Sequence, residues 1–469
     1  MQNLNADYLV IGCGAVSMAF VDTMLVETDA TFVIVDDRHM PGGHWNDAYS
    51  FVRLHQPSAY YGVSSKSLGS QRIDTIGSNK GFYEMASGAE VLAYFEQVMR
   101  ETFLPSGRVT YLPMCRYQGD GEIRSLVSKN TYHVSVAKSV VDGTFYKTSI
   151  PATHTPKFDV EEGVHCIIPN ELPRRAAGAA RYTVLGGGKT GMDALIWLLD
   201  NQVEPDRISW VCPRDSWLIN RRTTQPGAEF FADSVGGFAS QLEAIKDASS
   251  TEEIFLGFEA CGAMLRVDRE RLPTMFHYAT ISQGEIDQLR RIDNVIRQGR
   301  IATIGPDTLT TVGGESIKTS ADTLYIDCTA TAVGFDTTES VPVFQDGLIT
   351  LQALRAPLVT FSAALAAFVE ARVEGRKEKN KLCAPVILAD NPDQYLASFA
   401  GNMMNQKEWN SNKVVRDWTN QCRLSPLGAT VRDMDPENAE QMSMVARIRD
   451  SSMPAVMNLF KLIAQNQAA

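Results

Sequence analysis

The stretch "VLGGGKTGMDAL", residues Val184 to Leu195, matches parts of two nucleotide-binding patterns, and the choice between them decides the fold. A P-loop needs a glycine five residues before its Gly-Lys-Ser/Thr, because the backbone N–H groups there curl around the phosphates of a nucleoside triphosphate. Thr183 stands at that position instead. The dinucleotide pattern G-x-G-x-x-G is complete, through Gly186, Gly188 and Gly191.

The residues on both sides of these glycines fit a strand, a tight turn and a helix. The apolar run from Tyr182 to Leu185 is typical of a buried strand, and apolar residues recur at helical spacing from Leu195 to Leu199. This order places a pyrophosphate at a helix N-terminus, where backbone N–H groups point at it. We therefore interpret the stretch as a dinucleotide-binding turn in which Lys189 and Thr190 also contact the ligand.

A second copy of the pattern lies near the N-terminus, in "DYLVIGCGAVSMAF". Tyr8 to Ile11 is typical of a buried parallel strand, Gly12 and Gly14 supply the turn, and Val16 to Leu25 fits the helix that follows. Ser17 replaces the third glycine, where a small side chain still permits close packing of helix on strand. The sequence thus predicts two dinucleotide sites in one chain.

The residues that follow each turn distinguish the two ligands. The strand "TFVIVDD" ends at Asp36 and Asp37, and Asp36 lies 24 residues beyond Gly12, near the spacing at which a carboxylate binds ribose hydroxyls. After the second turn, "RISWVCPRDSW" offers Arg214 in place of a carboxylate. Arg214 and Lys189 favour a 2′-phosphate, so we expect NADPH in preference to NADH there. The alternative is that Arg214 is a solvated surface residue.

Composition limits the class of protein. At 469 residues the chain fits two or three domains, and its formal charge of −11 argues against a nucleic-acid or anionic-membrane surface. No apolar run reaches a membrane span and the first residues lack signal-peptide regions, which favours a cytoplasmic protein. The eight cysteines form no C-x-x-C and the seven histidines are dispersed, so we expect neither a dithiol centre nor a metal site.

Three further stretches carry a resemblance to a known family. "MPGGHW" (Met40 to Trp45) resembles a G-G-x-W loop, "IPATHTPKF" (Ile150 to Phe158) an A-T-G linker, and "DTLYIDCTATAVGF" (Asp322 to Phe335) a strand followed by A-T-G-F. With the two glycine turns, residues 7 to 370 resemble the class B flavoprotein monooxygenases, which include flavin-containing monooxygenases, Baeyer–Villiger monooxygenases and N-hydroxylases.

The resemblance implies cofactors and an architecture. FAD would bind at the first turn, with Gly43, His44 and Trp45 against the flavin, and NADPH at the second. The fold class is then α/β, with two Rossmann-like dinucleotide-binding domains, the second inserted in the first, and a helical C-terminal extension. We expect 1–165 and 320–372 to form the FAD domain, 182–315 the NADPH domain, and 373–469 the helical region.

The segment "FVRLHQPSAYYG" would run beside the flavin ring and supplies the candidate catalytic residues. Arg53 could stabilise a flavin peroxide or the reduced flavin anion, and His55 or Gln56 could donate a hydrogen bond to the ring or the substrate. For His55, a structural hydrogen-bonded role is the alternative. Trp217 follows Arg214 and could contact NADPH adenine or line the cleft between the domains; the alternative is a core or surface role.

The sequence also departs from the family at named positions. His154 and Ala332 replace the glycines of the two A-T-G segments, and the fingerprint before the second turn keeps only Phe158, Gly163 and His165. The expected function is an FAD- and NADPH-dependent monooxygenase that uses molecular oxygen on a small molecule. The alternatives are a flavin oxidoreductase or oxidase without oxygen insertion, and a flavin- and NADPH-binding sensor. Substrate identity and homo-oligomer formation stay open.

Overall fold

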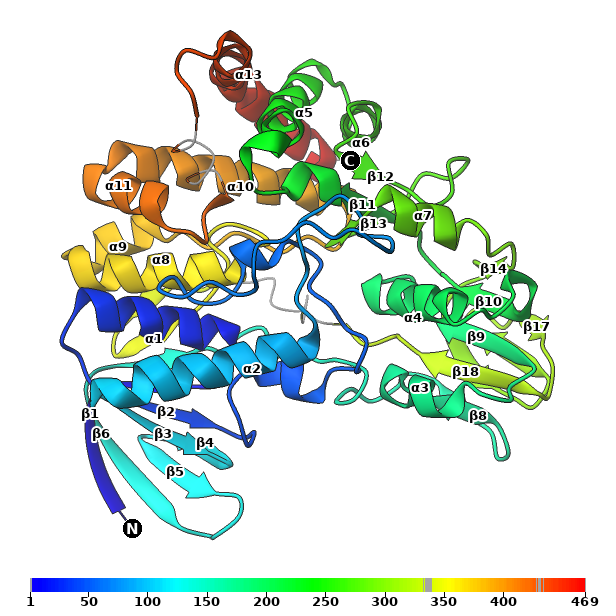
Figure 1. The fold of residues 1–469 in the computed structure, drawn as a ribbon, viewed down its shortest axis with the longest axis horizontal. Coiled ribbons are helices and arrows are strands. Elements are labelled where there is room, and N and C mark those ends of the chain that lie inside the picture. The colour runs from blue at the N-terminus through cyan, green and yellow to red at the C-terminus, as the bar shows by residue number, and fades with distance from the viewer. Residues whose placement is uncertain are drawn as a thin grey trace.

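A computed structural model describes residues 2–331, 333, 340–426, 428, 432 and 434–468. Two mainly parallel sheets carry the fold, one at the lower left and one at the right of Figure 1, and helices from the middle and the end of the chain lie above them. None of the helices in these ranges is long and apolar enough to span a lipid bilayer. The α/β class expected from the sequence is confirmed.

The first sheet contains the N-terminal glycine turn. Its strand order is β19-β20-β6-β1-β2-β3, parallel throughout except for the β19–β20 pair. The antiparallel β4–β5 hairpin joins it through β6. The strands are β1 (Gln2–Ile11), β2 (Phe32–Asp36), β3 (Val109–Pro113), β4 (Cys115–Gly119), β5 (Glu122–Ser125), β6 (Thr131–Asp142), β19 (Phe344–Gln345) and β20 (Leu348–Thr350).

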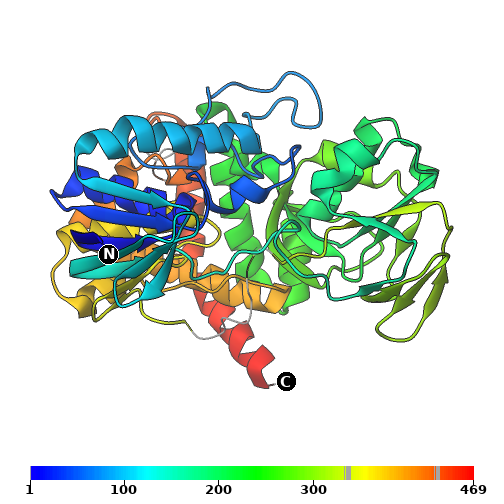
Figure 2. The same ribbon diagram turned by 90° about the horizontal axis from the view of Figure 1, so that it is seen from below.

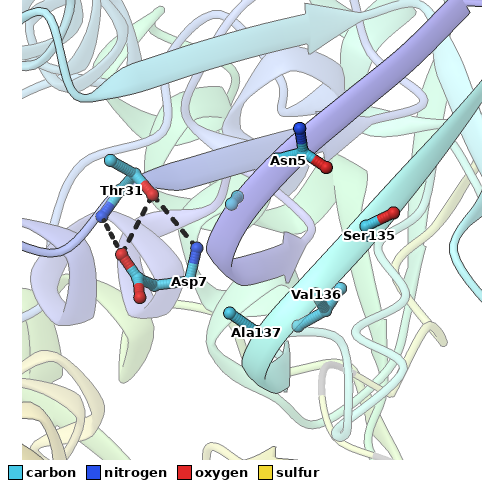
Figure 3. Close-up of a pocket in the computed structure, with 7 residues that line it drawn as sticks. Asn5, Asp7, Thr31, Ser135, Val136 and Ala137 are labelled. Carbon is cyan, nitrogen blue, oxygen red and sulfur yellow. Dashed lines mark hydrogen bonds between the residues drawn. The ribbon is translucent and has the colours of Figure 1, made fainter.

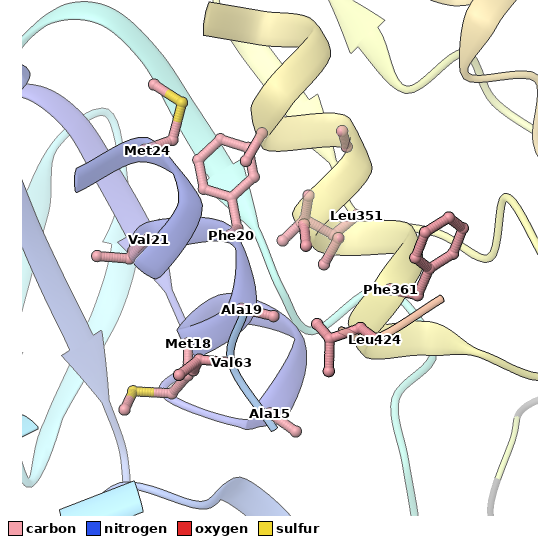
Figure 4. Packing of buried hydrophobic residues seen from close by; sticks show 14 of the residues in the cluster. Ala15, Met18, Ala19, Phe20, Val21, Met24, Val63, Leu351, Phe361 and Leu424 are labelled. Carbon is pink, nitrogen blue, oxygen red and sulfur yellow. The ribbon is translucent and has the colours of Figure 1, made fainter. Parts of the chain in front are cut away.

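Helix α1 (Ala15–Glu27) packs against α8 (Val359–Arg372) in the largest core of the protein. Figure 4 shows Phe20 of α1 close to Leu351 and Leu424 close to Phe361, so the C-terminal region contributes to this core. Helix α2 (Gly88–Val98) also lies beside this sheet and begins at Ser87 with a capping box.

The second sheet contains the other glycine turn and is parallel throughout, in the order β14-β10-β9-β18-β8. Its strands are β8 (His165–Ile167), β9 (Arg181–Leu185), β10 (Ile208–Val211), β14 (Val295–Ile296) and β18 (Thr323–Asp327), and its helices are α3 (Leu172–Arg175), α4 (Lys189–Asp200) and α7 (Gln283–Leu289).

The placement of β18 corrects one expectation. The sequence analysis assigned residues from 320 onward to the first sheet, yet β18 pairs with both β9 and β8 of the second. The physical reason is that Thr323 to Asp327 is buried throughout, as a strand between two neighbours must be. The exact residue limits of the two domains stay a proposal.

Two smaller sheets and several short helical turns complete the fold. The sheets are β12-β11-β13 and β17-β16-β15-β7. Their strands are β7 (Asp159–Val160), β11 (Ser216–Asn220), β12 (Met264–Leu265), β13 (Met275–Ile281), β15 (Ile301–Ile304), β16 (Thr308–Thr311) and β17 (Ser316–Lys318). The short helical turns are η1 (Gly43–Asp47), η2 (Ser58–Tyr60), η3 (Met99–Phe103), η4 (Leu104–Ser106), η5 (Pro169–Glu171), η6 (Pro205–Arg207), η7 (Arg221–Thr224), η8 (Ala228–Phe230) and η9 (Ala232–Gly236).

The C-terminal region is helical, as expected. Its helices are α9 (Arg376–Leu382), α10 (Pro392–Ser411), α11 (Lys413–Gln421) and α13 (Ala439–Ala468). Helix α13 packs against α5 (Gly237–Asp247), and Arg447 of α13 forms an ion pair with Glu243 of α5. Helix α6 (Thr251–Ala260) follows α5 in the chain. Asn458 of α13 also donates to the backbone carbonyl of Ile245 in α5.

Candidate functional site

The first glycine turn joins β1 to α1 and leaves the N-terminus of α1 without a side-chain cap. Gly12 has a φ of +86°, and Gly14 is the N-cap residue, with no side-chain hydrogen bond to the first turn. The loop that carries Gly43 packs directly on it, since Gly42 N donates to Cys13 O at 2.9 Å and a Cβ on Gly43 would lie 2.9 Å from Gly14 Cα. The backbone N–H groups of the first helical turn therefore suit an anion.

Asp36 lies at the end of β2 beside this turn. One carboxylate oxygen accepts from Cys13 N and the other from Arg38 N. Burial raises the pKa of Asp36, and these two hydrogen bonds oppose that rise. Because each carboxylate oxygen can accept a second hydrogen bond, Asp36 keeps capacity for ribose hydroxyls. Asp37 instead pairs with Arg116 at 2.7 Å on the surface.

Ser17 shows how the turn tolerates the missing glycine. Its hydroxyl is buried, has no hydrogen-bond partner among the described residues, and lies where a Cβ on Gly143 would be. A Cβ on Gly12 would in turn lie 2.9 Å from Cγ2 of Thr144. The loop after β6 therefore supplies the close approach that a third glycine normally permits. Sequence analysis missed this pair, since nothing near Gly143 resembles a motif.

The G-G-x-W loop forms a short aromatic layer beside the turn. Trp45 Nε1 donates to the hydroxyl of Tyr61 at 2.8 Å, and the ring of His44 stacks on Trp45 with centroids 5.5 Å apart. Burial lowers the pKa of His44 to about 4, so the imidazole is neutral near pH 7.

The second glycine turn repeats the backbone geometry of the first. Gly186 has a φ of +124°, and a Cβ there would lie 2.5 Å from the carbonyl oxygen of Cys328. Gly188 is the N-cap of α4 and again makes no side-chain cap, while a side chain on Gly191 would overlap the carbonyl of Gly186. The backbone therefore requires glycine at positions 186 and 191, whereas a side chain at Gly188 would meet open space.

Lys189, which begins α4, belongs to a buried ion cluster. Its ammonium pairs with the Asp193 carboxylate and lies 3.3 Å from Oε1 of Glu285. The fully buried Arg221 lies 2.6 Å from Oε2 of Glu285. Burial disfavours the charged ammonium, but the two carboxylates outweigh it and raise the pKa of Lys189. Burial also opposes ionisation of Glu285, yet Lys189 and Arg221 hold the pKa of this carboxyl at about 2.

The segment after the G-G-x-W loop reaches this cluster. Tyr49 donates its hydroxyl to Oδ2 of Asp193 at 2.8 Å, and the backbone carbonyl of His55 accepts from Nε of Arg221 at 3.3 Å. Burial, reinforced by the positive charge of Lys189, lowers the pKa of His55 to about 4. The imidazole of His55 is therefore neutral near pH 7 and lies within electrostatic reach of Lys189.

The other two catalytic candidates face different neighbours. Arg53 donates from Nη1 to the carbonyl of Met85 at 3.2 Å and lines an open hollow of about 670 Å³ beside α2, which Arg72 and Glu90 also line. Gln56 makes a 3.5 Å contact with the carbonyl of Tyr60. The structure thus brings His55, but not Arg53, to the ion cluster.

Arg214 and Trp217 each have a definite environment. Arg214 forms a two-pronged ion pair with Asp390, at 3.0 and 3.3 Å, and His277 lies 2.6 Å from the same carboxylate. Trp217 is buried, with Arg266 over its ring at 5.5 Å. The burial of Trp217 agrees with a role in core packing. Arg214, the residue expected to bind a 2′-phosphate, already has Asp390 as its carboxylate partner.

No family model matches the chain. The proteins named "Uncharacterized protein Rv2000" of Mycobacterium tuberculosis and "Uncharacterized protein Mb2023" of Mycobacterium bovis are each 43% identical over 426 residues, which cover 91% of this chain and 78% of theirs. The chain belongs to the family of these mycobacterial proteins.

Solved structures similar to this family member include a flavin-containing monooxygenase from Stenotrophomonas maltophilia, with a TM-score of 0.46, 16% identity, and coverage of 78% of this chain and 98% of that one. A cyclohexanone monooxygenase from Rhodococcus sp. Phi1 bound to NADP+ gives a TM-score of 0.47 at 14% identity, covering 80% and 86%. At these identities and TM-scores the likeness indicates no shared activity.

The two A-T segments of this family member meet in space. His154 stands where the first A-T-G pattern has its glycine. Its Nε2 is 2.8 Å from Oδ2 of Asp327, the last residue of β18, and both side chains are largely buried. Thr329 donates to the other oxygen of Asp327. Ala332, which replaces the second glycine, and residues 334–335 lie outside the described residues.

A second hollow, of about 330 Å³, lies beside β1 and β6 (Figure 3). Asn5 and Ser135 line it, and Asp7 at its edge is engaged with the backbone and hydroxyl of Thr31. Apart from Thr31, the lining residues belong to β1 and β6 at positions before the ends of these strands, whereas the glycine turn follows the end of β1. We therefore place the candidate site at the turns and not in this hollow.

Proposed function

We propose that the protein is an FAD- and NADPH-dependent oxidoreductase of the monooxygenase kind, acting on a small organic molecule in the cytoplasm. The observation that carries the proposal is the pair of strand, glycine turn and helix units, each at the carboxyl end of strands in its own parallel sheet. Both helices begin at a glycine without a side-chain cap. Such ends bind the pyrophosphate of a dinucleotide.

We assign FAD to the first turn and NADPH to the second. The first fits an adenosine ribose with free hydroxyls, because Asp36 retains acceptor capacity beside Gly12 and Gly14. A bound flavin would accept hydride from NADPH and react with oxygen. The protein's part is to hold both dinucleotides: Gly186, Gly188, Gly191 and Thr190 at the second turn, and Gly43, His44 and Trp45 beside the first.

Arg53, His55 and Gln56 remain the catalytic candidates. His55 is the best placed of the three, because its neutral imidazole lies close to the start of α4 and can donate or accept a hydrogen bond. For Arg53 we expect Arg53→Ala to retain flavin and to slow turnover, measured as NADPH oxidation per bound flavin. Unchanged oxidation rates would remove Arg53 from the catalytic set.

One experiment tests the proposal and its alternatives together. The purified protein is examined for flavin absorbance, reduced anaerobically with NADPH, and then mixed with oxygen in a stopped-flow instrument. Slow reoxidation through a long-lived absorbing species supports a monooxygenase. Immediate reoxidation with release of one hydrogen peroxide per NADPH indicates an oxidase or reductase, and bound flavin that NADPH does not reduce indicates a sensor. Protein that stays colourless after incubation with flavin contradicts all three.

A further inference from the structure

Helix α13 carries apolar side chains on two opposite faces. One face, which includes Ala455, Leu459 and Leu462, is buried in a core shared with α5 and α6. The other exposes Met453, Met457 and Phe460, with exposed fractions of 56%, 67% and 49%. Residues spaced by four and three lie on one side of a helix, so these three form a continuous patch, here called the α13 stripe. An amphipathic helix on a protein surface normally has a polar outer face.

Helix α13 lies at the edge of the molecule. Figure 1 shows it beside α5 at the top of the view, and in Figure 2 its C-terminal end projects from the body of the protein. Single exposed apolar residues are normal on a protein surface, but adjacent ones mark a contact site more often. The feature that calls for a partner is the grouping of two methionines and a phenylalanine over two helical turns.

Two opposite charges lie beside the stripe, one near each of its ends. Asp450 and Lys461 are 11 residues apart, from 450 to 461, and at 100° per residue they lie on the same side of the stripe, about 20° from each other. The midpoint between them falls between residues 455 and 456, within the stripe. A two-fold axis through that midpoint would place Asp450 of one helix opposite Lys461 of another, at both ends of an antiparallel pair.

We propose that the α13 stripe binds a second copy of this chain, as an antiparallel helix pair about this two-fold axis. Met457 of each copy then packs near the axis, and Phe460 of one copy contacts Met453 and Arg449 of the other. An isologous contact of this kind uses the same patch twice and closes as a dimer. The proposal does not depend on the flavin chemistry.

The charge pattern favours a second copy over a lipid surface. Helices that lie on membranes carry several Lys and Arg residues around the apolar face, because anionic headgroups attract them. Beside the α13 stripe, Arg449 pairs with Asp450 of the same helix at 2.8 Å. Among the described residues next to the stripe, Lys461 is then the cation available to a carboxylate of a second copy. The net charge of −11 also opposes binding to anionic lipid.

The test measures molar mass by light scattering during size-exclusion chromatography of the full chain. The wild type is expected at twice 51.6 kDa, and Met457→Glu at the monomer mass. Val26→Glu is the matched control, since Val26 of α1 is also 67% exposed, and it should stay dimeric. Circular dichroism checks that the variants are folded.

The charges give a second, independent readout. Asp450→Lys and Lys461→Asp should each weaken the dimer about tenfold or more, and the double variant should restore it, because the pair is exchanged rather than removed. A monomeric wild type at 50 µM, or a double variant no tighter than the singles, would overturn the proposal. So would binding to vesicles of phosphatidylcholine and phosphatidylglycerol that Met457→Glu abolishes, which would indicate a membrane surface instead.

Discussion

The two glycine turns have the same backbone conformation at their N-cap glycines but differ in the side chains that surround them. At the first turn Asp36 accepts hydrogen bonds from the backbone N–H groups of Cys13 and Arg38 and keeps acceptor capacity. At the second, Lys189 is paired with Asp193 and Glu285, and Arg214 with Asp390. Glycines therefore fix the backbone shape of each turn, whereas segments distant in the sequence supply the charges that surround it.

The largest effect should come from breaking the ion cluster at the second turn. Glu285→Ala leaves Lys189 and Arg221 buried without this carboxylate, which should reduce the free energy of unfolding by about 3–5 kcal/mol. Chemical denaturation measures it. Asp287→Ala, on the same helix but with an exposed carboxylate, is the control and should cost about 1 kcal/mol or less. Equal losses for the two variants would show that the cluster contributes nothing beyond a surface pair.

The next effect concerns the first turn. Gly12→Ala places a methyl group 2.9 Å from Thr144 Cγ2 on a residue with positive φ, so flavin content should fall about tenfold or more, as roughly 1–2 kcal/mol of strain would give. The ratio of flavin to protein absorbance measures it. Gly107→Ala also has a positive φ but faces open space, and should keep its flavin. Full flavin content in Gly12→Ala would mean that this turn does not hold the cofactor.

A smaller effect separates the two roles of Arg214. If a 2′-phosphate displaces Asp390, Arg214→Ala should raise the KM for NADPH about tenfold, the loss of about 1.4 kcal/mol, and leave the KM for NADH nearly unchanged. Asp390→Asn removes the competing charge and should lower the KM for NADPH. Steady-state kinetics with both nucleotides measures these changes, and equal effects of Arg214→Ala on both would refute the preference.

The smallest effect is a pH dependence. Arg214, and to a lesser extent His277, hold the pKa of Asp390 at about 2, against an ordinary value of 3.8, while partial burial opposes them. A lowered carboxyl pKa stabilises the folded state fully above pH 3.8, and this contribution is lost as the pH falls towards 2. Since the pair is partly exposed, we expect less than about 1 kcal/mol. Unfolding curves of the wild type and Asp390→Asn should converge over this range, and parallel curves would contradict the pairing.

The sequence predicted local features well. Both strand, turn and helix units, the position of Asp36 and the helical C-terminal region follow from glycine spacing, apolar periodicity and short-range order, which act over a few turns of chain. Ser17 also stands where the third glycine was expected, although its packing partner Gly143 lies 126 residues further along the chain.

Long-range pairings could not be predicted from one sequence. Glu285 lies 96 residues from Lys189, and Asp390 lies 176 residues from Arg214, so no local pattern connects them. The sheet to which β18 belongs was assigned wrongly for the same reason, because a short strand with an apolar centre fits either sheet. Trp217 was left between two roles, and only its neighbours in the folded chain could separate them.

The contact between His154 and Asp327 has a mechanical consequence. His154 lies on the first crossing between the two sheets, and Asp327 ends the strand from which the chain leaves the second sheet. Two connections that are joined by a buried side-chain pair resist twisting of one sheet relative to the other more than a single connection does. We therefore expect this contact to restrict rotation of one sheet relative to the other, so that bending is the main relative movement left to the two halves.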